Sequence, residues 1–206
     1  MMLVEDHRRT IFDYMHCPAY FEMKHIRKIP VIENVNHIKL LDKVAKYFYL
    51  NILNGRIPTT GELKNKWDSI CKDYEDQLDP KKVLEGFSLI MKLYHWAASE
   101  RIVVLDIDTP YAIHVEDTEI TGSMETVLAA PNSGYELLIT RFSNRLPDQT
   151  LIDMKLNITL NAYAFQKMNN KPVSGIKIRS VKHSKDFYTR RTEEDFKRLE
   201  TAIKNV

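Results

Sequence analysis

The chain has 206 residues, of which 44% are hydrophobic and 28% are charged. This balance supports a packed core and excludes a wholly disordered chain, and the length favours one domain or a core with one helical extension. The net charge of +2 is unevenly distributed, because residues 1–140 carry 16 basic and 21 acidic residues, whereas residues 141–206 carry 14 basic and 7 acidic residues.

The first half of the chain is predicted to be helical. Apolar residues recur there at helical spacing, and Thr59, Thr60 and Asp79-Pro80 are typical residues for helix starts. Asn54-Gly55 is a typical stop. The predicted helical segments cover residues 9–26 (divided into two short helices at Cys17-Pro18), 35–53, 59–77 and 79–99.

The pattern changes at Arg101 to short segments rich in β-branched and aliphatic residues, which predict an antiparallel meander. These segments cover residues 102–105, 111–115, 119–129 and 135–142. After Asp148 we predict one helix to about Lys167, then a strand in which Ile176 and Ile178 alternate with basic residues. The last helix begins at Thr192, which approximates a capping box with Asp195.

This order predicts an α+β fold class with a mixed sheet and an αβββαβ core. We divide the chain into an N-terminal helical region, residues 1–78, packed on a core of residues 79–206 that ends in the C-terminal helix. No uncharged apolar run approaches about 18 residues, and the N-terminus lacks the basic-then-apolar order of a signal peptide. We therefore expect a cytoplasmic protein with no membrane segment.

Four segments carry a resemblance to a known family. They are Thr10 to Phe21, with its Cys17-Pro18, Gly122-Ser123-Met124-Glu125, Glu136 to Asp148, and Leu156 to Phe165. In order and spacing they resemble the PD-(D/E)XK nuclease superfamily, in particular the RecB/AddB-type exonucleases and their small phage and CRISPR-adaptation relatives. The resemblance implies a restriction-endonuclease-like core.

The same resemblance implies an altered active site. In that family one Asp and one Asp or Glu bind Mg²⁺, and a Lys two residues after the second acid orients or activates water. Here Glu125 falls at the first acid, Ile139 at the second and Arg141 at the lysine, while Asn157 and Asn161 fall at the Gln and Tyr of the following helix. We expect a degenerate site with no catalytic residue.

The residues themselves support this expectation. Side chains alternate along a strand, so Glu136 would not share a face with Ile139. Mg²⁺ requires oxygen ligands, usually with one or two carboxylates, and arginine is never a neutral base. The alternative is a site that binds Mg²⁺ or Mn²⁺ through Glu125 and a displaced acid, Asp148 or Asp153. Cys17 alone cannot hold an iron–sulfur cluster, so none is expected.

A groove could persist without a metal. Asp153, Asn157 and Asn161 recur every four residues and would line one helix face, either in the cleft or in solvent. Tyr188 could stack on a base or pack with Phe187. The residues predicted to contact nucleic-acid phosphates are Arg141, Arg145, Lys177, Arg179, Lys182, Lys185, Arg190 and Arg191.

These observations favour a catalytically inactive, nuclease-like protein of viral or mobile-element origin. It would bind DNA or another nucleic acid, or a protein partner, as a subunit in DNA processing or transcription. Two alternatives stay open: a weak Mg²⁺- or Mn²⁺-dependent DNA exonuclease, and a protein-only inhibitor or assembly subunit that acts through the acidic N-terminal part.

Overall fold

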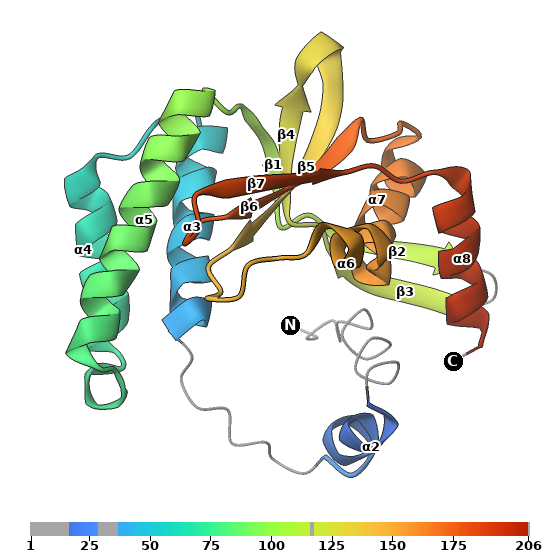
Figure 1. Ribbon diagram of the computed structural model, residues 1–206, viewed down its shortest axis with the longest axis horizontal. Coiled ribbons are helices and arrows are strands. Elements are labelled where there is room, and N and C mark those ends of the chain that lie inside the picture. Colours follow the sequence, from blue (N-terminus) through green and yellow to red (C-terminus); the bar gives the residue numbers. More distant parts are fainter. Residues whose placement is uncertain (1–16, 29–36, 116–117, 206) are drawn as a thin grey trace.

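The computed structural model describes residues 17–28, 37–115 and 118–205, and shows a central sheet between helical layers (Figure 1). The fold is α+β, with an N-terminal helical part, as the sequence predicts. The predicted helical residues 9–16 and 35–36 lie outside the described residues, as does the beginning of the first resembling segment. Within the described ranges, no helix is both long and apolar enough to cross a membrane.

Six helical segments precede the sheet among the described residues, and two of them begin at a side-chain cap. They are α2 (Pro18–Phe21), the π-helix η1 (Glu22–Ile26), α3 (His37–Leu53), α4 (Thr60–Lys72), the 3₁₀-helix η2 (Glu75–Gln77) and α5 (Pro80–Glu100). Thr59 and Glu62 form a capping box at α4, and Asp79 caps α5 ahead of Pro80. The prediction of one continuous helix over residues 59–77 is wrong, because α4 ends at Lys72.

Five strands form the main sheet in the order β1-β4-β5-β6-β7. Their bounds are β1 (Val104–Ile107), β4 (Thr126–Ala130), β5 (Gly134–Arg141), β6 (Gly175–Ser180) and β7 (Lys185–Thr189), with the 3₁₀-helix η3 (Pro131–Ser133) between β4 and β5. Only β5 and β6 pair in parallel, through the crossover that contains α6 (Gln149–Met154) and α7 (Leu156–Asn169). The sheet is therefore mixed, as predicted.

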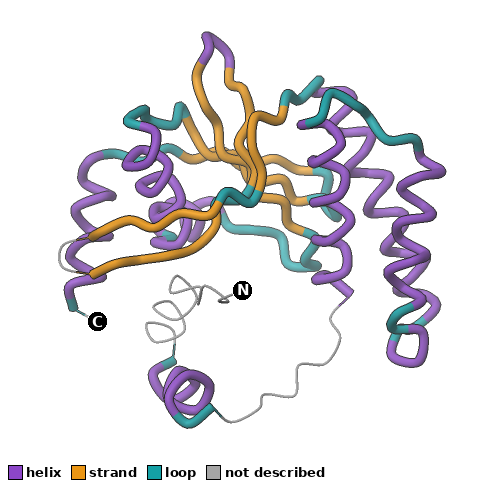
Figure 2. The backbone as a smooth tube through the Cα atoms, turned by 180° about the vertical axis from the view of Figure 1, so that it is seen from behind, coloured by secondary structure: helices purple, strands orange, loops and turns teal. Residues whose placement is uncertain are grey.

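The helices α3, α4 and α5 cover one face of this sheet, and Figure 2 shows them together on one side of the strands. Their apolar residues join sheet residues such as Leu128 and Leu138 in one buried cluster. Trp67 of α4 is 1% exposed, and its Nε1 donates to the carbonyl of Val83 in α5 at 3.0 Å. This face is held together by burial of about twenty side chains, the dominant stabilising effect in a fold of this size.

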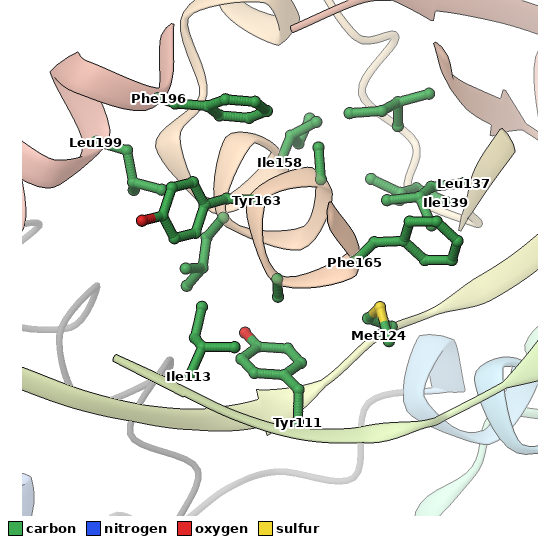
Figure 3. Packing of buried hydrophobic residues seen from close by; sticks show 14 of the residues in the cluster. Tyr111, Ile113, Met124, Leu137, Ile139, Ile158, Tyr163, Phe165, Phe196 and Leu199 are labelled. Atoms are coloured by element: carbon green, nitrogen blue, oxygen red, sulfur yellow. The ribbon is translucent and has the colours of Figure 1, made fainter. Parts of the chain in front are cut away.

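The opposite face packs on α7, which lies between the sheet and a separate two-stranded sheet of β2 (Pro110–Val115) and β3 (Thr118–Ser123). Figure 3 shows Leu137 and Ile139 on one side of α7, and Tyr111 and Ile113 on the other. The last helix, α8 (Glu193–Lys204), adds Phe196 and Leu199 to the same cluster. Residues 158–165 of α7 are all buried, so this helix has no polar stripe.

The predicted strands differ from the structure in three respects. Residues 119–129 form two strands rather than one, separated at Met124 and Glu125, and β2 and β3 leave the predicted meander to pair with each other. The segment 185–189 is an additional strand, β7. The alternation of apolar and polar residues in this segment is too short to predict a strand, because only Phe187 and Thr189 are buried.

The predicted helix over residues 148–167 is divided at Lys155, whose backbone is extended (φ −72°, ψ 113°). At this break the carbonyl of Ile152 accepts two hydrogen bonds, from the backbone N–H of Lys155 at 3.2 Å and from Nη2 of Arg191 at 2.9 Å. Neither proline nor glycine marks the break in the sequence. The prediction that Asp153, Asn157 and Asn161 share one helix face is therefore wrong: Asp153 lies in α6, and Asn161 is 5% exposed within α7.

Candidate functional site

The break between β3 and β4 places Glu125 under helix α3. The carbonyl of Glu125 accepts a hydrogen bond from the backbone N–H of Asp108 at 3.0 Å. The neighbouring Met124 is buried in the cluster around α7, whereas Glu125 lines a pocket on the other face of the sheet. The irregular backbone at these two residues therefore determines which layer each side chain enters.

This pocket, called here the α3 pocket, has a volume of about 320 Å³. Its polar floor contains the Tyr49 hydroxyl, which hydrogen-bonds with Oγ1 of Thr140 at 2.7 Å. Burial raises the pKa of Tyr49, so the phenol stays neutral. The lining residues are Lys39, Asp42, Lys43, Ala45, Lys46, Tyr49, Ile107, Asp108, Glu125, Thr126, Leu138, Thr140 and Arg141.

Two carboxyl groups that the sequence did not single out join Glu125 in this pocket. Asp108 forms an ion pair with Lys46 of α3. Asp42 lies on α3, and desolvation raises its pKa to about 6, while attraction to the Arg141 guanidinium opposes this shift. The side chain of Asp42 keeps access to solvent, so its desolvation is partial.

Ile139 does not face Glu125. It is 2% exposed and lies with Leu137 in the cluster around α7, on the other face of the sheet (Figure 3). The expectation of an isoleucine opposite Glu125 in one cleft is therefore corrected: the two residues enter different layers. The alternation of Leu137 and Ile139 against Leu138 and Thr140 is confirmed.

The donor set of the α3 pocket does not fit a hydrolytic divalent ion. Asp108 is held by Lys46, and Asp42 faces Arg141. No group of three metal-ligating side chains converges in the part of the chain that the structure describes. The proposed displaced acids do not enter this pocket either, because Asp148 caps α6 and Asp153 accepts a hydrogen bond from Gln149.

A second pocket, of about 360 Å³, lies between the end of β5 and the helices α6 and α7. Three cationic side chains line it, and we call it the cationic cleft: Arg141, Arg145 and Lys155. Desolvation lowers the pKa of Lys155, and repulsion from Arg141 and Arg145 lowers it further. Within the described ranges, none of the three forms an ion pair closer than 4 Å.

The remainder of the cationic cleft is mostly apolar, with one carboxylate among its lining residues. That carboxylate, Asp148, accepts the backbone N–H of Leu151 at 3.0 Å as the N-cap of α6. Arg141 and Arg145 were predicted from the sequence, whereas Lys155 was missed because the helix break that places it there was missed. The cleft therefore holds like charges together, with the nearest carboxylate already engaged by backbone.

Other predicted cations are engaged with protein carboxylates. Lys177 lies between Glu100 and Glu136, at 3.7 and 3.6 Å. Lys182 contacts Glu85 and the side-chain oxygen of Asn144, each at 2.6 Å. These two side chains lie apart from the cationic cleft, since neither lines it.

Arg179 is buried. Its Nη1 contacts Asp186 at 3.1 Å, and its guanidinium lies 5.0 Å from the ring centroid of Trp96, whose Nε1 also donates to Asp186. Arg179 thus joins the sheet to α5. This contact is structural rather than a surface for phosphate.

Arg191 is also committed to the fold, because it donates to Thr159, Thr189, and the carbonyls of Arg190 and Ile152. Two other residues of the predicted basic set, Arg190 and Lys185, are more accessible to solvent. Arg190 is exposed beside α6, and Lys185 lies over the ring of Phe187 at 4.9 Å. Of the predicted aromatic pair, Phe187 is buried and Tyr188 is 43% exposed.

Comparisons with known proteins give no family. No family model matches the chain, and no curated protein matches it. One solved structure, described as "Crystal structure of SSO0001", is similar at 13% identity over 81% of this chain and 84% of that one, with a TM-score of 0.35. This likeness is too low to carry an argument about fold or function.

Proposed function

We propose that this protein binds nucleic acid through its phosphates at the cationic cleft, on a nuclease-like scaffold that does not hydrolyse them. The observation that carries the proposal is the convergence of Arg141, Arg145 and Lys155. Like charges held close together destabilise each other until an anion arrives, so such a cluster favours phosphate. Arginine also matches phosphate geometry with a fork of donors.

The strand order is compatible with the resemblance to PD-(D/E)XK nucleases. A helix precedes three strands, β1, β4 and β5, that pair antiparallel, and a helical crossover leads to the parallel β6. We retain that resemblance as part of the proposal. The absence of hydrolysis is argued from Ile139, whose side chain lies in the core, and from the pairing of Asp108 with Lys46.

The proposal is tested by fluorescence anisotropy with a labelled single-stranded oligonucleotide and its duplex at low salt. We expect Arg145→Ala combined with Lys155→Ala to weaken binding by about tenfold or more. The slope of log affinity against log salt should become shallower by about 1.4 for the single strand, because two phosphate contacts are lost.

A charge-matched control is Lys81→Ala with Lys204→Ala, which removes two exposed lysines from α5 and α8. If this control weakens binding as much as the cleft variant, net charge alone accounts for the affinity and the site is wrong. If the wild-type protein binds neither probe at low salt, the proposal fails and the protein-only alternative is favoured.

A further inference from the structure

Arg141 belongs to two pockets at once. It is the last residue of β5, and it lines both the α3 pocket and the cationic cleft. Its backbone is fixed, because its carbonyl accepts the N–H of Val181 at 2.9 Å. Its side chain is a long arginine, and no ion pair closer than 4 Å holds it among the described residues. Among the described residues, Arg141 is the one that lines both pockets, so its guanidinium can couple them.

Asp42 lines the α3 pocket together with Arg141. The other charged groups around Asp42 come from each element packed there: Lys39, Lys43 and Lys46 from α3, Asp108 from the β1–β2 turn, and Glu125 from the break between β3 and β4. Lys46 forms an ion pair with Asp108. Attraction to the Arg141 guanidinium favours the ionised form of Asp42, against the larger effect of desolvation.

We infer that Asp42 is a built-in competitor of phosphate for the Arg141 guanidinium, and so sets the affinity of the cationic cleft. This inference rests on the proposed function. An ionised Asp42 draws Arg141 toward the α3 pocket, leaving Arg145 and Lys155 to hold the phosphate. A neutral Asp42 leaves Arg141 free to join them. Because coupling between sites is reciprocal, phosphate in the cleft also favours the neutral form of Asp42.

The competition predicts how the affinity of the cleft for phosphate changes with pH. The carboxyl of Asp42 has its pKa raised to about 6, so above that value it competes and below it the competition ends. Phosphate binding should therefore tighten as the pH falls through this range. Any change with pH that arises in other groups is common to wild type and to a variant at Asp42.

The experiment measures binding of the same labelled single-stranded oligonucleotide, at constant low salt, to the full chain. At about pH 8 we expect Asp42→Asn to bind about fivefold more tightly than wild type, a typical size for coupling between sites. At about pH 5 the two proteins should bind alike. The matched control is Asp108→Asn, which removes the same charge from the same pocket but from a carboxylate that pairs with Lys46.

A second variant separates competition from simple charge removal. In an Arg141→Gln background, Asp42→Asn should give no gain. Equal gains in Asp42→Asn and Asp108→Asn, or a gain that survives Arg141→Gln, would overturn the inference. If wild type binds but Asp42→Asn binds no better, the inference alone fails. If wild type does not bind at any pH, the proposed function fails, and the inference fails with it.

Discussion

Glu125 and Ile139 lie on opposite faces of the five-stranded sheet. Glu125 lines the pocket under α3, whereas Ile139 is buried among the residues around α7. The cause is the irregular stretch at Met124 and Glu125, which shifts the alternation of side chains before β4 begins. No single substitution at position 139 would therefore place a second carboxylate beside Glu125.

This relationship predicts that Ile139→Asp will not create a metal site and will destabilise the fold. A carboxyl group at a position 2% exposed has no partner in the apolar cluster around α7. We expect a loss of about 3 kcal/mol or more in the free energy of unfolding, measured with urea. The control Ile139→Val should lose only about 1 kcal/mol. A stable Ile139→Asp protein that binds Mn²⁺ would show that residue 139 faces a cleft.

The same geometry predicts no nuclease activity. Incubation of labelled single- and double-stranded DNA with Mg²⁺ or Mn²⁺ should leave the substrate intact. The two carboxyl groups that share the pocket with Glu125 interact with protein cations, Asp108 with Lys46 and Asp42 with Arg141. The matched variant is Glu125→Ala. Cleavage by the wild type that disappears in Glu125→Ala would contradict this expectation and favour the exonuclease alternative.

Arg179 and Asp186 should contribute to stability rather than to ligand binding. The side chain of Arg179 is only 8% exposed. Asp186→Ala therefore leaves the guanidinium of Arg179 buried without its counterion. We expect a loss of about 2 kcal/mol in the free energy of unfolding. Arg179→Met, which removes the buried charge, should cost less and leave oligonucleotide affinity unchanged. A large drop in affinity for Arg179→Met would instead support the sequence-based assignment of Arg179 to the nucleic-acid interface.

The sequence predicted the elements whose signals are local. The helix start at Thr59, the capping box at Thr192 and the alternation in β6 all concern neighbouring residues, and all are confirmed. The break at Lys155 was missed because no proline or glycine stands there, and one of the two donors to the Ile152 carbonyl, Arg191, comes from a distant segment. β7 was missed because only two of its residues are buried.

The candidate site divides in the same way. Glu125 and Arg141 could be proposed from sequence, because they stand in segments that resemble a family. Asp42 could not, since a carboxylate on the polar side of an amphipathic helix is ordinary until the sheet packs below it. Its proximity to Arg141 joins residues about a hundred positions apart, which no local periodicity encodes.

The packing of α4 on α5 gives a further prediction. A methyl group on Gly86 would lie 2.3 Å from a ring carbon of Trp67, which is 1% exposed and held by its hydrogen bond to Val83. Gly86→Ala should therefore lower the free energy of unfolding by about 2 kcal/mol, although alanine is the better helix former. Gly61→Ala in α4 is the control, because its methyl would meet nothing closer than 3.9 Å. An equally stable Gly86→Ala would contradict this packing.

Asp42 also predicts how stability changes with pH, independently of any ligand. Its pKa rises on folding from an ordinary 3.8 to about 6. A carboxyl with a raised folded pKa contributes stability that is fully present below about pH 4 and is lost as the pH rises through about 6. Asp42→Asn removes this loss. The variant should therefore be as stable as wild type near pH 4 and more stable than wild type at neutral pH.

The expected advantage is small, about 0.5 kcal/mol, because Asp42 keeps access to solvent and the effect is screened. Thermal unfolding of wild type and Asp42→Asn at a series of pH values measures it. Asp76→Asn, an exposed residue of η2, changes the net charge equally and serves as the control. A constant difference between Asp42→Asn and wild type from acid to neutral pH would mean that Asp42 does not titrate in this range. In that case the pH dependence inferred for the cationic cleft would lose its cause, while competition between Asp42 and phosphate could still act at all pH values where both are ionised.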